Sequence, residues 1–581
     1  MPLHDSEKYT IRNLFEQNVQ FSIPSYQRAY SWEVDGTRKH VRQFIEDLAE
    51  QHPQKDYYLG HFLFEDHKPG SLFVIDGQQR LTTVVIFFSC LIRELEQRTA
   101  SDAEAQTIGA LDLQRLARTY LRRDGKRRFT TVGCDAPFFD DLILDRSSTE
   151  PGDTRSRKRI AQAATHFSRE FKKPETSTLI HWARLVEGAA ITTFKVSDKV
   201  QATQIFSFQN DRGKGLTDLE KLKAFLAYQI YLNSEEGEEP EAVGHVERRF
   251  AEIYEKTEEI EWLNEDQILG HHCTAYLLGW GSGIETIKKE IGKVDGRTPK
   301  VDWVKSFSSA LRDSFAHVKA LEMLAVRHEC IADPIILDGP NAWPMLLKLY
   351  KFYGKDLLSP SFTRLLRLIE VSFFKFKFLH GRCKNLLPDW AKAFEGQRLE
   401  ELESRLAWAA KQSFMGGQDC DASFRNSLES SYHWSPVFRY VLWKYENANR
   451  VQGDYELSPG IYVNELGDPR MGSTLDHITP RNPKDLSYEE SFNREYLNNI
   501  GNLVLMPHGM NARFNNKLPA EKYSLLAESS LFSHREVGKI IQKDGKWEQE
   551  QIEARKRRLV DFALNRWEAK IETPEITFTQ T

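Results

Sequence analysis

The segment Leu72-Phe-Val-Ile-Asp-Gly-Gln-Gln-Arg-Leu81 decides how the first part of this chain folds. Its four leading apolar residues predict a short buried strand, and Asp76-Gly77 is typical of a tight turn. The apolar run from Leu81 to Ile92 then predicts a buried helix. A strand, a glycine turn and a helix start together place backbone N–H groups and the positive end of a helix at one point. That arrangement suits a phosphate group.

The turn also carries a dense set of hydrogen-bonding side chains. Asp76, Gln78, Gln79 and Arg80 surround and follow Gly77 within five consecutive residues. A turn that must only be soluble does not require so many directional groups. A solvated turn with an arginine ion pair is the alternative interpretation, and the local pattern alone does not separate the two.

Length and composition restrict the class of protein. The chain has 581 residues, of which 40% are hydrophobic and 28% charged, so we expect a globular protein of several domains. Because the formal net charge is −5, any contact with nucleic acid must use local basic patches. The six cysteines form no Cys-x-x-Cys pair, which argues against a disulfide framework and fits a reducing cytoplasm. We therefore expect a cytoplasmic protein without a membrane span.

Two further polar loops accompany the first one. Tyr26, Gln27 and Arg28 lie in an aromatic-rich loop after a proline, which is typical of a recognition loop but fits a lid over a small core equally well. Asn210 and Arg212 belong to the glycine turn Asn210-Asp-Arg-Gly-Lys-Gly215, which precedes a helix-capping box at Thr217-Asp-Leu-Glu220. The mixture of short strands and helices before residue 100 predicts an α+β domain in which the first two loops converge.

The rest of the chain divides by composition. The acidic stretch from Asn233 to Glu241 is the best candidate linker, and the periodicity from Ala242 to about Arg450 is helical. We therefore predict three domains over residues 1–235, 236–450 and 451–581. The predicted fold class is α+β and multidomain, with a helical middle.

A second chemical motif lies in the last of these segments. Asp476-His477 ends a predicted strand, a second strand starts at Asn502, and a helix is expected to begin near Asn511. The Asp476 carboxylate and the Asn511 amide are hard oxygen donors that suit Mg²⁺ or Mn²⁺ bound to a scissile phosphate. His477 points to the other side of the strand, where it could act as a general base on water.

Two residues of this motif keep alternative roles. Asn502 is better placed to pin the loop, and so to orient His477 for catalysis, than to bind a metal. His508 competes with His477 and Asn511 for the role of base or ligand, and only geometry can decide between them.

Both ends of the chain resemble known families. Asp476-His-Ile-Thr-Pro480, Gly501-Asn-Leu-Val-Leu505 and Asn511 resemble the His-Asn-His (HNH) nuclease superfamily, whose ββα-metal site uses such a pair as ligand and base and the final Asn to complete the metal site. The N-terminal half resembles the companion domain of GmrSD-type modification-dependent restriction enzymes, through Ile23–Trp32, Ile75–Leu81 and Asn210–Glu220. That domain is similar to the ParB/sulfiredoxin fold, and its Asp-Gly-Gln-Gln-Arg motif is associated with nucleotide binding and hydrolysis.

The resemblance implies a nucleotide-regulated, metal-dependent endonuclease that restricts modified or phage double-stranded DNA. A nucleoside triphosphate would bind, and be hydrolysed, at the turn from Asp76 to Arg80, with Arg80 on a phosphate. The residues of the other two polar loops would line the same cleft. A homo-oligomer is one assembly state that the sequence leaves open. Two alternatives remain: a ParB-like DNA-binding module that needs no nucleotide, and a nuclease toxin that acts on host nucleic acid.

Overall fold

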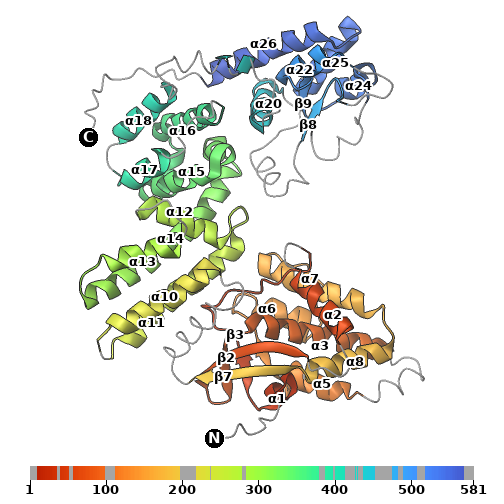
Figure 1. Cartoon of the computed structure of the whole chain (residues 1–581), viewed down its shortest axis with the longest axis vertical. Coiled ribbons are helices and arrows are strands. Elements are labelled where there is room, and N and C mark those ends of the chain that lie inside the picture. The colour runs from red at the N-terminus through yellow and green to blue at the C-terminus, as the bar shows by residue number, and fades with distance from the viewer. Residues whose placement is uncertain are drawn as a thin grey trace. The chain divides into compact units, whose positions relative to one another are not determined.

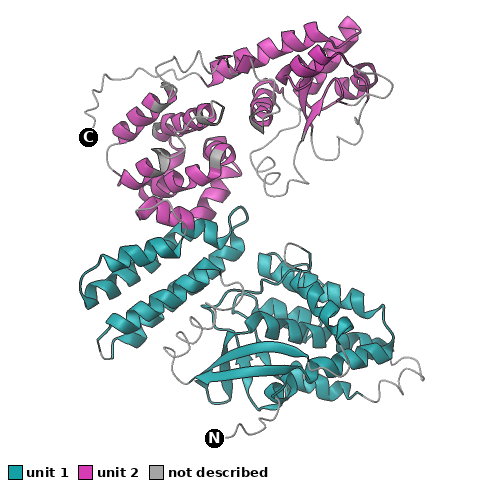
Figure 2. Ribbon diagram, viewed as in Figure 1, with its two compact units in different colours: residues 1–269, 281–316 teal, residues 270–280, 317–581 magenta. Residues whose placement is uncertain are grey.

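The computed structural model describes residues 9–35, 39–51, 57–98, 111–196, 217–235, 237–277, 283–378, 386–396, 399–411, 425–426, 428–429, 436–451, 474–481, 488–506 and 517–567. The chain divides into two compact units, residues 1–269 with 281–316 and residues 270–280 with 317–581 (Figure 2). The described parts are mostly helical and include one five-stranded mixed sheet, which confirms the expected α+β, multidomain arrangement. The predicted boundaries near residues 235 and 450 stay a prediction.

The first unit contains a five-stranded sheet in the order β6-β1-β3-β2-β7 (Figure 1). Its strands are β1 (Gln20–Ser22), β2 (Tyr58–Lys68), β3 (Ser71–Asp76), β6 (Phe129–Thr130) and β7 (Ala190–Val196). β1 runs parallel to β3 and β6, whereas β2 is antiparallel to β3 and parallel to β7. The carboxyl ends of β1 and β3 therefore lie at the same edge of the sheet as the amino end of β2.

Helices cover one face of this sheet, with α3 at their centre (Figure 1). They are α1 (Ile11–Glu16), α2 (His40–Glu50), α3 (Gln78–Arg98), α5 (Leu113–Tyr120), α6 (Ala136–Phe139), α7 (Arg155–Phe171) and α8 (Thr176–Glu187). Between α5 and β6 lies the hairpin of β4 (Arg122–Arg123) and β5 (Lys126–Arg127). After α6, one π-helical turn covers Asp140–Leu144.

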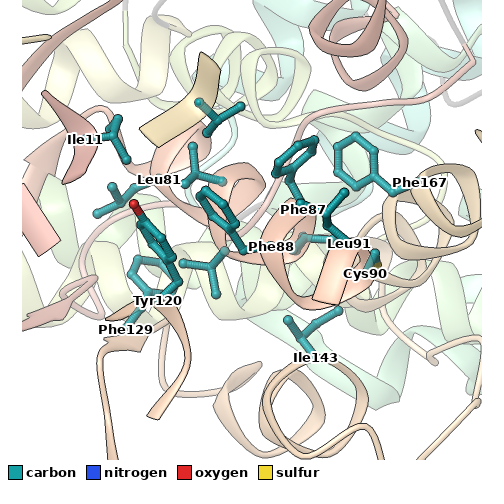
Figure 3. Packing of buried hydrophobic residues seen from close by; sticks show 14 of the residues in the cluster. Ile11, Leu81, Phe87, Phe88, Cys90, Leu91, Tyr120, Phe129, Ile143 and Phe167 are labelled. Carbon is teal, nitrogen blue, oxygen red and sulfur yellow. The ribbon is translucent and has the colours of Figure 1, made fainter. Parts of the chain in front are cut away.

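The core of the first unit forms around α3, as the apolar run from Leu81 predicts. Every residue from Leu81 to Ile92 is buried. Figure 3 shows aromatic rings on both sides of this helix, and the ring of Phe88 stacks on that of Tyr120 with centroids 3.8 Å apart. Phe87 meets Phe167 edge to face at 5.9 Å. Because α3 is buried on all sides, its first turn is held firmly at the sheet edge.

The other face of the sheet packs against α10. Leu63, Ile75 and Val196 form a small apolar cluster with Ala224 of that helix. The helices that follow β7 along the chain are α10 (Asp218–Asn233), α11 (Glu239–Glu259), α12 (Glu265–Tyr276), α13 (Ile284–Gly292) and α14 (Arg297–Ala325). The predicted capping box at the start of α10 is confirmed, because the Thr217 hydroxyl accepts from the Glu220 N–H and the Glu220 carboxylate accepts from the Thr217 N–H.

The second unit combines a helical part with a small α+β part. Its helices are α15 (Glu329–Tyr353), a 3₁₀ turn (Gly354–Leu358), α16 (Pro360–Phe378), α17 (Leu386–Ala393), α18 (Leu399–Lys411), α20 (Pro436–Asn449), α22 (Glu490–Glu495), the 3₁₀ turn η4 (Ile500–Asn502), α24 (Pro519–Ala527), α25 (Phe532–Asp544) and α26 (Gln549–Arg566). Its strands β8 (Thr474–His477) and β9 (Leu503–Met506) pair antiparallel, with His477 opposite Leu503. No helix among the described residues is both long and apolar enough to cross a membrane.

Buried ionic groups on α20 join the two parts of this second unit. The Lys444 ammonium lies 2.6 Å from an Asp333 carboxylate oxygen on α15. One turn away, the hydroxyl of Tyr440 and the indole N–H of Trp567 donate to the Glu370 carboxylate at 3.0 and 2.9 Å. Burial raises the pKa of Asp333 to about 7, because the charged form is poorly solvated there. Breaking such a buried pair destabilises a protein strongly, so α20 is fixed to α15, to α16 and to the residue after α26.

The final helix α26 holds the turn before β9. Arg555 is fully buried, and its guanidinium donates to the carbonyl oxygens of Gly501 and Leu503 at 2.9 and 2.6 Å. Gly501 makes this close approach possible, since a β-carbon there would overlap the carbonyl oxygen of Ile552 on α26.

Gly501→Ala should therefore destabilise the second unit by roughly 1–3 kcal/mol, because the helix backbone cannot yield as a flexible side chain would. Gly339→Ala is the matched control in the same unit, since its β-carbon would come no nearer than 3.8 Å to Trp343. Urea unfolding of the full chain followed by tryptophan fluorescence measures both. Equal midpoints for Gly501→Ala and wild type would contradict this packing.

Candidate functional site

The turn from Asp76 to Arg80 lies at the sheet edge between β3 and α3. Gly77 has a φ of +86°, and a β-carbon there would overlap the ring of Phe62, so this position requires glycine. The first helical hydrogen bond of α3 runs from the Leu81 N–H to the Gly77 carbonyl at 2.9 Å. The three preceding N–H groups have no partner within the helix and point out of its start. The strand, glycine turn and helix start are thus as the sequence predicts.

Two glutamines join this turn to the aromatic-rich loop. The Gln27 side chain donates to the Ile75 carbonyl at 3.1 Å. Gln79 accepts from the Ser31 N–H at 2.8 Å and donates to the Ala29 carbonyl at 3.1 Å. Each glutamine therefore fixes a backbone segment of the other loop, and the predicted convergence of the first two loops occurs.

Arg80 braces α3 against the start of β2. Its guanidinium donates to the carbonyl oxygens of Leu59 and His61 at 3.3 and 2.8 Å and lies 5.1 Å from the ring centre of Phe62. Gly60 leaves room for it, since a β-carbon there would collide with the Arg80 side chain. Burial lowers the pKa of Arg80. These contacts give Arg80 a structural role that the sequence did not reveal, and a contact with phosphate stays a prediction.

Two features of this edge suit a polar ligand. His61, which the sequence reasoning missed, places its Nε2 atom 3.1 Å from the Asp76 carboxylate. Gln78 is only 6% exposed, and its amide oxygen has no hydrogen-bond partner within the described part of the chain. A buried polar atom without a partner is costly, and it marks a place where a ligand would complete the hydrogen bonding. The alternation of side chains along β2 could have pointed to His61, but only once the pairing of β2 with β3 was known.

The aromatic-rich loop also contacts α10, the helix that follows the third polar loop. Arg28 forms an ion pair with Glu220 at 3.0 Å, and the ammonium of Lys223 donates to the Tyr26 carbonyl at 3.1 Å. The hydroxyl of Tyr26 lies 3.4 Å from the Glu65 carboxylate. The structure thus ties Tyr26 and Arg28 to neighbouring helices and strands. Asn210 and Arg212 lie outside the described residues.

The second candidate site lies on the β8–β9 hairpin, where Asp476 and His477 are adjacent at the end of β8. The His477 ring is buried, and its Nε2 atom lies 3.0 Å from the amide oxygen of Asn498. Burial lowers the pKa of His477, although the hydrogen bond that the ring donates to the Asn498 amide oxygen partly opposes this effect. His477 is therefore held mainly as the neutral imidazole at neutral pH.

Asn502 fixes the chain that leaves β8. It is fully buried, its amide oxygen accepts from the Thr479 N–H at 2.9 Å, and its amide nitrogen donates to the Leu497 carbonyl at 2.9 Å. Its own carbonyl accepts from the Ile478 N–H at 2.8 Å. Asn502 thus holds the segment directly after His477, which is a positioning role and leaves no side-chain oxygen directed at a metal.

The donors described near Asp476 fit a divalent cation in part. One carboxylate oxygen of Asp476 faces the Lys522 ammonium at 3.1 Å, and the other meets no described hydrogen-bonding group. A carboxylate oxygen of this kind is a hard donor suited to Mg²⁺ or Mn²⁺. The other predicted ligand, Asn511, and the rival His508 lie outside the described residues. Within the described ranges, no three His, Cys, Asp or Glu side chains gather as a metal site.

Comparison with protein families matches a domain model to each end of the chain. The model of the GmrSD restriction endonuclease N-terminal domain matches residues 11–227, and that of the C-terminal domain matches residues 419–562. A comparison with curated protein sequences gave no match. The two domain matches define the class of this protein as a restriction nuclease with DNA as its substrate. The chain belongs to the GmrSD restriction endonuclease family.

The buried ring of His534 on α25 contacts strand β9 of the hairpin. Its titration makes the stability of the second unit depend on pH. His534 is fully buried, and its ring nitrogens lie 2.7 Å from the Leu505 carbonyl and 3.0 Å from the Ser529 hydroxyl. Burial lowers its pKa to about 4. Since an unfolded histidine binds a proton near pH 6.5, the unfolded state is favoured increasingly as the pH falls from about 6.5 to about 4.

We expect about 3 kcal/mol of unfolding free energy to be lost over that interval through His534. His534→Gln, which cannot titrate, should be less stable at pH 7.5 but should show a shallower decline on acidification. His181→Gln, at an exposed position, serves as the control and should keep the wild-type slope. An identical pH dependence for wild type and His534→Gln in urea titrations would contradict the burial of a neutral His534.

Proposed function

We propose that this protein is a nucleotide-regulated, metal-dependent endonuclease that restricts modified or phage double-stranded DNA in the cytoplasm. The observation that carries the proposal is the Asp476–His477 pair, in which the histidine ring is oriented by Asn498 and the following backbone by Asn502. Membership of a restriction endonuclease family gives this pair a phosphodiester substrate. The β8–β9 hairpin would belong to an HNH-type ββα unit within residues 451–581.

His477 would act as the general base of the cleavage. With the Asn498 amide oxygen as the acceptor, the proton of the neutral ring would lie on Nε2. The basic lone pair is then on Nδ1, where it would accept a proton from the attacking water. The lowered pKa keeps His477 in this form at neutral pH.

Asp476 would hold the metal ion through the carboxylate oxygen that does not face Lys522, with Asn511 as the second ligand. A bound Mg²⁺ or Mn²⁺ would neutralise the charge that develops on the scissile phosphate. The role of Asn502 in this scheme is to keep His477 at a fixed distance and orientation, because a small displacement of a base lowers its effectiveness strongly.

The nucleotide would bind in the first unit, within a ParB/sulfiredoxin-like domain over residues 1–235. The start of α3 supplies N–H groups and the positive helix end for a phosphate. The amide oxygen of Gln78, which has no partner among the described residues, and the Asp76–His61 pair would supply further polar contacts, and hydrolysis of the nucleotide is part of the proposal. The state of the nucleotide would control cleavage through the helical residues 236–450.

The cleavage site is tested by His477→Ala. Loss of a general base should lower the rate of plasmid or phage DNA cleavage in Mg²⁺ by about a hundredfold or more. His181→Ala, at an exposed site in the first unit, should cleave as wild type does. Equal rates for wild type and His477→Ala would remove His477 from the mechanism.

The nucleotide site is tested by Gln78→Leu, which keeps the volume of the side chain and removes its amide. Because the buried amide oxygen of Gln78 can accept a hydrogen bond from a donor of the nucleotide, such as a ribose hydroxyl or a base amino group, and such a bond contributes roughly 0.5–1.5 kcal/mol, the Kd for the bound nucleoside triphosphate should rise by roughly two- to tenfold. Gln43→Leu on the exposed surface of α2 is the control. Isothermal titration with each of the four ribonucleoside triphosphates measures the affinities. A wild type that binds none of them would leave the turn with a structural or DNA-contacting role.

A further inference from the structure

Lys522 of α24 is a buried lysine that the cleavage chemistry proposed above does not use. Only 1% of its side chain is exposed. Its ammonium lies 3.1 Å from the Asp476 carboxylate and donates to the His477 carbonyl at 2.6 Å. A lysine is rarely buried without such partners, because its charge loses the solvation of water. The position of Lys522 therefore depends on these two consecutive residues of β8.

We propose that Lys522 is a positioning residue of the cleavage centre. Its ammonium holds one oxygen of Asp476 and the backbone of His477, so that the other carboxylate oxygen is presented to a divalent cation. This inference rests on the proposed endonuclease function and adds to it a residue that acts through Asp476 and His477.

The backbone contacts support this role. The peptide group between His477 and Ile478 is held at both ends, since its carbonyl accepts from Lys522 and its N–H donates to the Asn502 carbonyl. The orientation of the His477 ring is in turn fixed by the hydrogen bond between its Nε2 atom and Asn498. Lys522 is the one group among these that also contacts the Asp476 carboxylate. It therefore couples the orientation of the metal ligand to that of the base.

The charge of Lys522 gives the proposal a specific signature. A divalent cation bound to the Asp476 carboxylate oxygen that does not face Lys522 would lie close to the Lys522 ammonium. Two positive charges that are close together repel each other. Lys522 therefore weakens cation binding while it fixes the geometry for cleavage. A residue that only stabilised the fold would affect cation binding and cleavage in the same direction.

The test measures Mn²⁺ affinity by isothermal titration and DNA cleavage by single-turnover kinetics on the full-length protein. For Lys522→Met we expect the Kd for Mn²⁺ to fall by about tenfold, because the repulsion is removed. We expect the cleavage rate at saturating Mn²⁺ to fall by about tenfold or more, because Asp476 and His477 lose a common anchor. Lys539→Met, at an exposed position of α25, should match wild type in both measurements.

Lys522→Gln serves as the second variant if Lys522→Met does not fold, since it removes the charge but keeps a donor for the His477 carbonyl. It should also bind Mn²⁺ more tightly and cleave more slowly than wild type. A folded variant with unchanged cleavage overturns the proposal, and so does a folded variant in which Mn²⁺ affinity and the cleavage rate fall together. Failure of both variants to fold also overturns it, because Lys522 would then be a structural residue. If wild type does not cleave DNA at all, the proposed function fails, whereas the change in Mn²⁺ affinity still reports on Lys522.

Discussion

The geometry of both candidate sites depends on cationic side chains, two fully buried and one partly buried, that are bound to backbone carbonyl groups. A charged side chain inside a protein is stable only when hydrogen-bond acceptors surround it. Arg80 meets this requirement with the carbonyls at the start of β2, Arg555 with those of the turn before β9, and Lys522 with the last carbonyl of β8. Each cation fixes a backbone segment that carries proposed functional side chains. Removing any of these cations would take hydrogen bonds away from these carbonyls and loosen the site beside it.

The sequence predicted the local elements well and the long-range contacts poorly. The strand, turn and helix from Leu72 to Ile92 and the capping box before α10 follow from residue pattern and turn chemistry, and both are present. The pairing of Lys522 with Asp476 joins residues 46 positions apart, so no local pattern signals it. The contacts of Arg80 could not be predicted either. Its acceptors are backbone carbonyls of β2, and every residue type carries a backbone carbonyl. Functional motifs were visible because chemistry requires particular residue types at particular spacings, whereas the residues that support them are defined only by packing.

The two sites divide the proposed activity between the two units. The first unit offers a helix start, which suits the phosphates of a nucleotide, and beside it the buried amide oxygen of Gln78, which has no partner among the described residues and can accept from a donor of the nucleotide. The second unit offers a carboxylate and a neutral imidazole on one strand, which suits phosphodiester cleavage. In the second unit, the Lys444–Asp333 pair and the contacts of Glu370 connect α15 and α16 to the helix α20 and the end of α26. Since α20 also packs against β9, and α26 against the turn before it, these buried pairs connect the helical part of the second unit to the β8–β9 hairpin.

The most direct test of the account is the rate of DNA cleavage as a function of nucleotide concentration, at fixed Mg²⁺, for wild type and Gln78→Leu. If the first site controls the second, the wild-type rate should follow the occupancy of the nucleotide site measured by titration, and the curve for Gln78→Leu should shift to higher concentration by the same factor as its Kd. A wild-type rate that does not change between zero and saturating nucleotide would contradict the central claim that the turn from Asp76 to Arg80 regulates cleavage at Asp476 and His477.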